Sequence, residues 1–135
     1  MIKVFLGGTA NGSSWREQLK SILKVDFVDP IVEDWTENHK ERELKEREIC
    51  NYILYVITPR MEGLYSIAEL VDDSNKRSNN TLFCFLNKEV SDAGKPIVFD
   101  YNLESSIKAI EELLITNGAI KFNSLEEIAE FLNKE

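Results

Sequence analysis

Three side chains that could take part in chemistry lie close together after a long apolar segment. Tyr65, Glu69 and Asp72 are four and three residues apart, so on a helix they stack on one side. A carboxylate at the rim of a pocket, beside an aromatic ring, suits attack on a sugar. Cleavage of an N-glycosidic bond passes through a cation-like sugar, which a carboxylate stabilises or traps as a glycosyl ester. Glu69 is therefore the candidate nucleophile.

Such a reaction needs a second acid to help the departing base and a surface on which that base can stack. Glu62 or Asp72 could supply the acid. The base could stack on one of three aromatic side chains, Tyr65, Trp15 or Trp35. Each of these residues also has a purely structural interpretation, which needs no function. A glutamate early in a helix is stabilised by the helix dipole, Asp72 and Asp73 suit a solvated helix face, and the aromatic rings suit packing.

The element that must position these acids is the apolar run Tyr52 to Ile57. A run of this length without polar alternation indicates a strand that is covered on both faces, as in a parallel sheet. Thr58 and Pro59 end it, and a helix begins near Leu64. Leu64, Ile67, Ala68 and Val71 share one side of that helix and are predicted to face the sheet. The acids then follow the carboxyl end of the strand, where ligands bind in open α/β sheets.

A second segment that could contact a ligand is the loop from Gly7 to Gly12, which follows a strand predicted at Ile2 to Leu6. The candidate substrate-binding residues here are Gly7, Gly8, Thr9 and Asn11. The loop is neither a Walker A sequence nor a spaced dinucleotide fingerprint, and it suits a ribose better than a phosphate. Ser14 and Glu17 have capping-box spacing, which predicts a helix with a buried stripe of Trp15, Leu19, Ile22 and Leu23.

The other elements alternate along the chain. Further strands are predicted at Asp26 to Val28, at Thr81 to Leu86 and, as an edge strand, at Pro96 to Phe99. Glu37 to Ile49 is a charged, solvated helix with i,i+4 ion pairs of Glu41 with Lys45 and of Glu43 with Arg47. It has little to bury beyond Leu44 and Ile49, and His39 lies on its surface. A helix marked by Leu103 to Leu114 ends at Asn117-Gly118, and a capping box of Ser124 and Glu127 starts the last one. This alternation predicts a three-layer α/β/α fold with a mainly parallel five-stranded sheet in the order 2-1-3-4-5.

Composition limits the classes of function. The 135 residues suit one domain, and 43% hydrophobic and 30% charged residues are ordinary for a soluble protein. The net charge of −8 argues against a nucleic-acid partner. No segment is long enough to span a bilayer and no signal peptide is visible, so we expect a cytoplasmic protein. Cys50 and Cys84 are expected to be reduced core residues, and we expect neither a metal nor a cofactor.

Three segments carry a resemblance to a known family. They are the opening KVFLGGT strand and loop, the Asp29-Pro30 pair, and YVITPRMEGLYSIAE. With these segments the chain resembles the nucleoside 2-deoxyribosyltransferase-like family, a flavodoxin-like group, as a single domain over residues 1–135. The resemblance implies that Glu69 is the nucleophile, that Ser66 is the small hydroxyl residue three positions before it, and that Gly7 to Asn11 line the sugar site. It also implies a homo-oligomer, for which Tyr65, Met61 and Trp35 offer contact surface.

One departure affects the expected activity. The family's transferases carry an Asp-Gly pair shortly before the serine, where this chain has Met61-Glu62-Gly63-Leu64-Tyr65. Glu62 is the candidate replacement for that aspartate. We expect a protein that acts on the N-glycosidic bond of a deoxynucleoside or deoxynucleotide, by transfer to a second base or by hydrolysis. The alternative is a non-catalytic module that binds a nucleotide in the same cleft.

Overall fold

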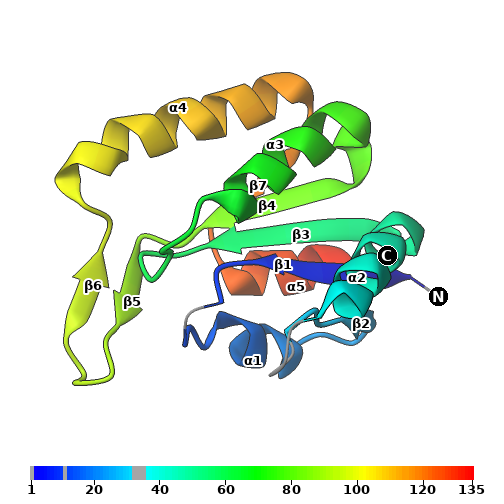
Figure 1. The fold of residues 1–135 in the computed structure, drawn as a ribbon, viewed down its shortest axis with the longest axis horizontal. Helices are drawn as coiled ribbons and strands as arrows, with labels where there is room; N and C mark the ends of the chain where they lie inside the picture. The colour runs from blue at the N-terminus through cyan, green and yellow to red at the C-terminus, as the bar shows by residue number, and fades with distance from the viewer. Residues whose placement is uncertain (1, 11, 32–35) are drawn as a thin grey trace.

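Five parallel strands form the central sheet of the computed structural model, which describes residues 2–10, 12–31 and 36–135. The order is β2-β1-β3-β4-β7, and every neighbouring pair is parallel. The bounds are β1 Lys3–Gly8, β2 Asp26–Val28, β3 Tyr52–Ile57, β4 Thr81–Phe85 and β7 Ile120–Phe122. The predicted order 2-1-3-4-5 is confirmed, with β7 as the fifth strand of the sheet (Figure 1).

Helices cover the sheet on both faces, which confirms the three-layer arrangement. One face packs against α3 (Tyr65–Lys76) and α4 (Tyr101–Asn117), and the other packs against α1 (Trp15–Lys20) and α5 (Leu125–Asn133) (Figure 1). Side chains of a strand point alternately to the two faces. On β3, Ile53, Tyr55 and Ile57 therefore pack toward α3 and α4, and Leu54 and Val56 toward α1 and α5. This explains why the segment has no polar alternation.

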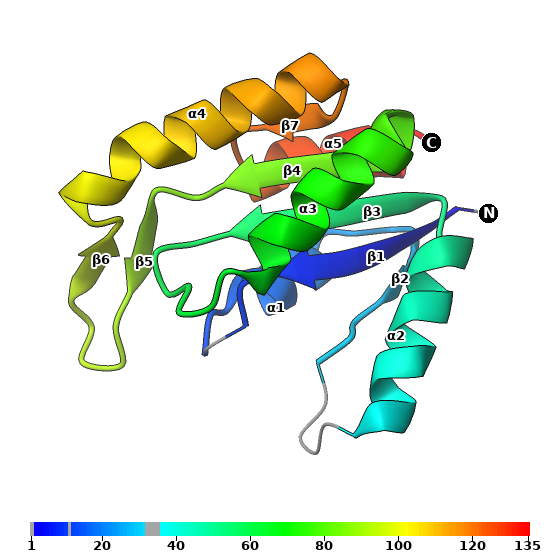
Figure 2. The same cartoon turned by 45° about the horizontal axis from the view of Figure 1, so that its top comes forward.

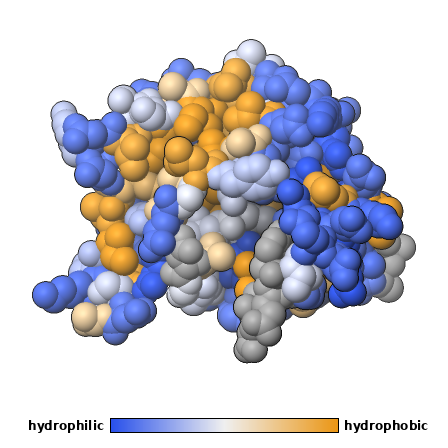
Figure 3. All heavy atoms as spheres, in the orientation of Figure 1, coloured by the Kyte–Doolittle hydropathy of each residue, from blue (hydrophilic) through white to orange (hydrophobic). Residues whose placement is uncertain are grey.

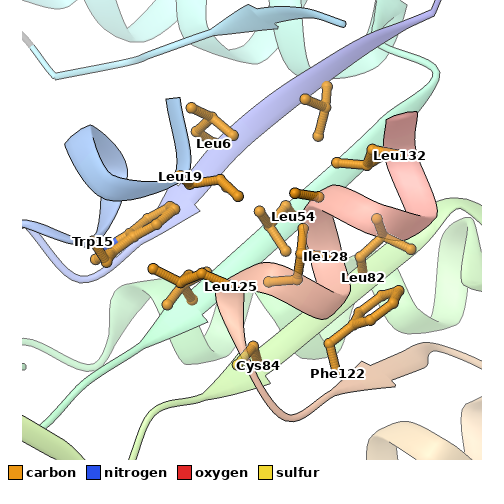
Figure 4. Packing of buried hydrophobic residues seen from close by; sticks show 13 residues of the cluster. Leu6, Trp15, Leu19, Leu54, Leu82, Cys84, Phe122, Leu125, Ile128 and Leu132 are labelled. Carbon is orange, nitrogen blue, oxygen red and sulfur yellow. The ribbon is translucent and has the colours of Figure 1, made fainter. Parts of the chain in front are cut away.

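The core on the side of α1 and α5 contains one aromatic side chain that was a candidate base platform. Figure 4 shows Trp15 and Leu19 of α1 next to side chains of β1 and β3, with α5 closing the same face. Trp15 is 1% exposed and belongs to this core, so it offers no surface to a ligand. Cys84 lies in the same core, and both it and the half-buried Cys50 are free thiols, as predicted.

The first helix differs from its prediction. Ser14 is the N-cap of α1, but its side chain makes no capping bond and instead accepts a hydrogen bond from Gln18 Nε2 at 2.8 Å. The helix ends at Lys20, so Ile22 lies beyond it and is exposed. The capping box predicted at Ser124 is only half formed. The Ser124 hydroxyl accepts a hydrogen bond from the Glu127 backbone N–H at 3.1 Å, but the Glu127 carboxylate accepts from the Asn123 N–H at 2.8 Å instead of from that of Ser124.

The charged helix α2 (Glu37–Ile49) has the predicted bounds but buries a different side chain. Leu44 and Ile49 are exposed, and Arg47 is the one buried residue of this helix, all of which the structure describes. His39 helps to cap the helix, since its ring Nδ1 accepts a hydrogen bond from the Thr36 N–H at 3.2 Å. Figure 2 shows α2 on the side of the sheet where β1 and β2 lie. Because the buried side chain of α2 is an arginine, the helix is held to the rest of the protein by a polar contact, the ion pair of Arg47 with Glu69 of α3.

The predicted edge strand lies outside the main sheet. Pro96–Val98 forms β6, which pairs antiparallel with β5 (Lys88–Val90) in a separate hairpin, so its assignment to the sheet was wrong. The fifth place is taken by β7, a strand of three residues between the end of α4 and the start of α5. Gly118 ends α4 in a left-handed conformation, as predicted, and turns the chain directly into β7.

Apolar side chains remain on one face of the molecule. In Figure 3 they gather between α4 and the start of α3, whereas the part of this face that α2 contributes is hydrophilic. Leu64, at the N-cap of α3, is 70% exposed, and Leu103 on α4 is 43% exposed. Within the described part of the chain, no helix has the length and apolar character needed to cross a membrane.

Candidate functional site

The loops that follow β1 and β3 are joined directly to each other at the carboxyl ends of the two strands. The Thr9 N–H donates to the carbonyl of Val56 at 2.9 Å, and the Thr58 N–H donates to Thr9 Oγ1 at 3.0 Å. Gly8 has a φ of +116°, and a Cβ on it would lie 2.1 Å from the Val56 carbonyl oxygen. The close approach of the two backbones thus requires a glycine at this position.

Two consecutive side chains at the start of α1 fix the glycine loop. Trp15 Nε1 and Arg16 Nη1 both donate to the carbonyl of Thr9, each at 2.7 Å. Arg16 Nε also donates to the carbonyl of Leu6 at 3.1 Å and lies 3.6 Å from Asp29 Oδ1. Burial lowers the pKa of Arg16 to about 10, against the opposing effect of Asp29, so the guanidinium stays charged at neutral pH. The sequence reading missed this anchoring role.

The hairpin of β5 and β6 docks on both loops. Arg60, which follows β3, donates from Nε to the carbonyl of Val90 at 3.2 Å and pairs with Asp92 at 3.2 Å. On the other loop, the hydroxyl of Ser13 donates to the carboxylate of Glu89. The hairpin therefore lies beside the place where the strand order changes direction, and it holds the two loops in position.

A cavity of about 160 Å³ lies next to these loops. It is lined by Gly7 and Gly8 of β1, by Arg16, and by the side chains of Ser66 and Glu69 on α3 and Glu43 on α2. Ligand pockets for drug-sized molecules are usually ~300–1,000 Å³, so this volume suits a group the size of one sugar ring. The cavity brings together two carboxylates from different helices at the carboxyl ends of parallel strands.

Glu69 is mostly buried, with 14% of its side chain exposed. Its Oε2 accepts a hydrogen bond from Arg47 Nη1, which makes a charge-assisted pair. Burial raises the pKa of Glu69 to about 6 against the lowering effect of Arg47, and the carboxylates of Glu43 and Asp73 act in the same direction as burial. At neutral pH this carboxyl is therefore mainly ionised, as a nucleophile must be.

Glu43 is the second carboxylate of the cavity, and burial raises its pKa against the opposing effects of Arg47 and Arg16. The sequence suggested only an ion pair of Glu43 with Arg47 on a solvated helix. No spacing signal could have found its place in the cavity, because that depends on how α2 lies against α3.

A buried carboxylate binds the hydroxyl of Tyr55, a residue that lines the cavity. Asp73 is completely buried, accepts a hydrogen bond from Tyr55 Oη at 2.7 Å, and pairs with Arg77 Nε at 3.2 Å. The prediction that Asp73 lies on a solvated helix face was wrong. The helix α3 turns Leu70 and Ser74, which are also buried, toward the interior in place of the exposed Leu64 and Ala68, and this brings Asp73 inside.

The structure brings some of the predicted site residues together and separates others. Gly7, Gly8, Ser66 and Glu69 line the cavity, and Ser66 Oγ lies 3.5 Å from the Gly8 carbonyl to which it donates. Thr9 is adjacent but uses its side chain to bind Thr58. The remaining predicted residues do not line it: Glu62 and Tyr65 are exposed, and Asp72 pairs with Lys76 at 2.9 Å. Asn11 and Trp35 lie outside the described residues.

Comparison with known proteins identifies a family. The family described as nucleoside 2-deoxyribosyltransferase like matches residues 1–87, which is more than half of the chain and includes every residue of the cavity. No curated protein and no solved structure matches the chain. Among residues 2–10, 12–31 and 36–135, no group of three or more His, Cys, Asp or Glu side chains could hold a metal ion. The chain belongs to the nucleoside 2-deoxyribosyltransferase-like family.

Proposed function

We propose that this protein acts on the N-glycosidic bond of a deoxynucleoside or deoxynucleotide, with Glu69 as the nucleophile. The observation that carries this proposal is the position of Glu69, whose carboxylate lines a sugar-sized cavity next to the glycine loop. One carboxylate oxygen forms a bond to the anomeric carbon, and the carbon–nitrogen bond breaks with its electron pair going to the base. A second base, or water, then attacks the glycosyl ester and restores Glu69.

The departing base needs a proton, and Glu43 is the side chain best placed to give it. Glu62 and Asp72 were the candidates from the sequence, but neither lines the cavity. Glu43 does line it, and burial favours its protonated form. It therefore donates a proton to the base as the bond breaks, and it takes a proton back from the incoming base or water.

A non-catalytic function is the second candidate, and one observation favours it. The carboxylate of Glu69 is already paired with Arg47, and such pairing lowers the electron density available for attack. A protein that only binds a nucleotide would use the glycine loop, Ser66 and the apolar residues that also line the cavity, Phe5, Pro30 and Ile31. The two functions differ in the fate of the ligand: an enzyme cleaves its N-glycosidic bond, whereas a binding protein releases it unchanged.

The test is an exchange assay. Wild-type protein is incubated with each of the four deoxynucleosides, or its 5′-monophosphate, together with a different free base. Chromatography with mass spectrometry then detects the exchanged nucleoside, and free deoxyribose reports hydrolysis. We expect turnover in the wild type and a loss of ~10³-fold or more in Glu69→Gln, since no neighbour replaces a nucleophile. Asp72→Asn, which removes an exposed carboxylate from the same helix, is the control and should keep full activity.

Two results would count against the proposal. An active Glu69→Gln variant would exclude Glu69 as the nucleophile. A wild type that binds deoxynucleosides in calorimetry and returns them unchanged over long incubation would favour the binding function.

A further inference from the structure

Arg47 contacts the candidate nucleophile from outside the cavity. It extends from α2, is 9% exposed, and donates from Nη1 to Oε2 of Glu69. Arg47 is not one of the residues that line the cavity, whereas Glu69 is. The arginine therefore binds one oxygen of the carboxylate without occupying the space in which a sugar would lie.

The position of Arg47 is itself fixed by neighbours other than Glu69. Its Nη1 lies 3.5 Å from Tyr55 Oη, and that hydroxyl donates to Asp73 Oδ2 at 2.7 Å. Arg77 Nε pairs with Asp73 Oδ1 at 3.2 Å, and Arg77 Nη1 donates to the carbonyl of Arg47 at 3.5 Å. Together these contacts form a closed chain that starts at Arg47 on α2, passes through β3 and α3, and returns to Arg47. The carboxylate of Asp73, 3.8 Å from Arg47 Nε, also balances the buried charge of the guanidinium.

Building on the proposed function, we propose that Arg47 is a positioning residue for the reaction: it holds Oε2 of Glu69 and leaves Oε1 free to attack the anomeric carbon. A carboxylate on a flexible glutamate side chain otherwise samples several rotamers, and few of them aim an oxygen at the sugar. A fixed donor removes that freedom before the substrate binds, which is the general way in which orientation lowers a barrier.

The charges around Glu69 make this role distinguishable from a purely structural one. Arg47 and Glu43 face Glu69 from α2, Asp73 faces it from its own helix α3, and Tyr55 faces Arg47 from β3. Of these groups, Arg47 is the cation that lowers the pKa of Glu69, whereas Glu43 and Asp73 raise it. Loss of Arg47 must therefore shift the ionisation of Glu69 to higher pH.

The experiment compares Arg47→Met with Arg42→Met, which removes an exposed arginine from the same helix. The carboxyl carbon of Glu69 is followed by NMR over pH in ¹³C-labelled protein and assigned with Glu69→Gln. We expect its titration to move to higher pH in Arg47→Met and to stay in place in Arg42→Met. In the exchange assay, kcat should fall by ~10²-fold in Arg47→Met with little change in KM, because orientation is lost while binding is kept.

Arg47→Lys provides a second variant that retains the cation, which serves if Arg47→Met does not fold. It should keep the Glu69 titration near that of the wild type and recover part of kcat. An active wild type whose Arg47→Met variant retains kcat, or retains the titration of Glu69, would overturn the positioning role alone. A wild type without any exchange or hydrolysis would overturn the proposed function, and the role of Arg47 with it.

Discussion

Replacing Glu69 by glutamine should stabilise the folded protein at neutral pH, although it removes the candidate nucleophile. The pKa of this carboxyl rises from 4.5 to about 6 on folding, mainly because of burial. Each unit corresponds to ~1.36 kcal/mol, so ionised Glu69 costs the fold about 2 kcal/mol. With only 14% of the side chain exposed, solvent screening reduces this value little. Glutamine has no charge to bury, and its amide oxygen can still accept a hydrogen bond from Arg47.

The effect must depend on pH with a definite sign. Because the pKa is higher in the folded state, protonated Glu69 favours folding, and this contribution is complete below about pH 4.5 and lost as the pH rises through about 6. Urea unfolding of the wild type and Glu69→Gln between pH 4 and 8 measures the difference. We expect Glu69→Gln to be more stable by ~2 kcal/mol at pH 7 and equal to the wild type near pH 4. A Glu69→Gln variant that is less stable at pH 7, or a difference that does not change with pH, would refute the reasoning.

Three further predictions concern the loop, the second acid and assembly. Gly8→Ala should lose ~3 kcal/mol or more of stability in thermal unfolding, since its Cβ would overlap the Val56 carbonyl, whereas Gly63→Ala, with nothing within 4 Å, should lose almost none. Glu43→Gln should lower kcat ~10²–10⁴-fold on natural nucleosides but leave cleavage of a p-nitrophenyl 2-deoxyriboside unchanged, because that leaving group departs without a proton. Equal losses on both substrates would exclude Glu43 as the acid. Light scattering should give a mass above that of one chain, formed through the apolar surface between α3 and α4, and a monomeric mass would exclude this assembly.

Elements with a strong local signal could be predicted from the sequence. The run Tyr52 to Ile57 has the bounds of β3, because six apolar residues flanked by polar ones define where the strand begins and ends. The helix 37–49 also has its predicted bounds, and Gly118 ends α4 as expected. The strand β7 was missed, because three residues between a helix end and a helix start carry no periodicity. Its pairing depends on the position of β4, with which it aligns Leu82 with Ile120.

Side chains whose environment depends on tertiary packing could not be predicted. Asp72 and Asp73 are neighbours of the same type, yet one is exposed and the other completely buried, since the rotation of α3 decides which faces Tyr55. Arg47 and Glu43 belong to a helix rich in charge, where a solvated face is the usual outcome. Their burial follows from the placement of α2 against α3, which no pattern within α2 encodes. The position of Glu69 beside a cavity could be predicted, because the residue follows the carboxyl end of a central strand in a parallel sheet.

The position of α5 in the chain has a consequence for synthesis of the protein. Leu54 and Leu82 lie on central strands that emerge from the ribosome early, yet the cover for that face is completed by Ile128 and Leu132 of α5. Until α5 has been made, the nascent sheet presents an apolar face to water or to other chains. A ribosome that stalls before residue 125 would therefore leave a product with a sheet that is ready to aggregate, and chaperones would have to protect it.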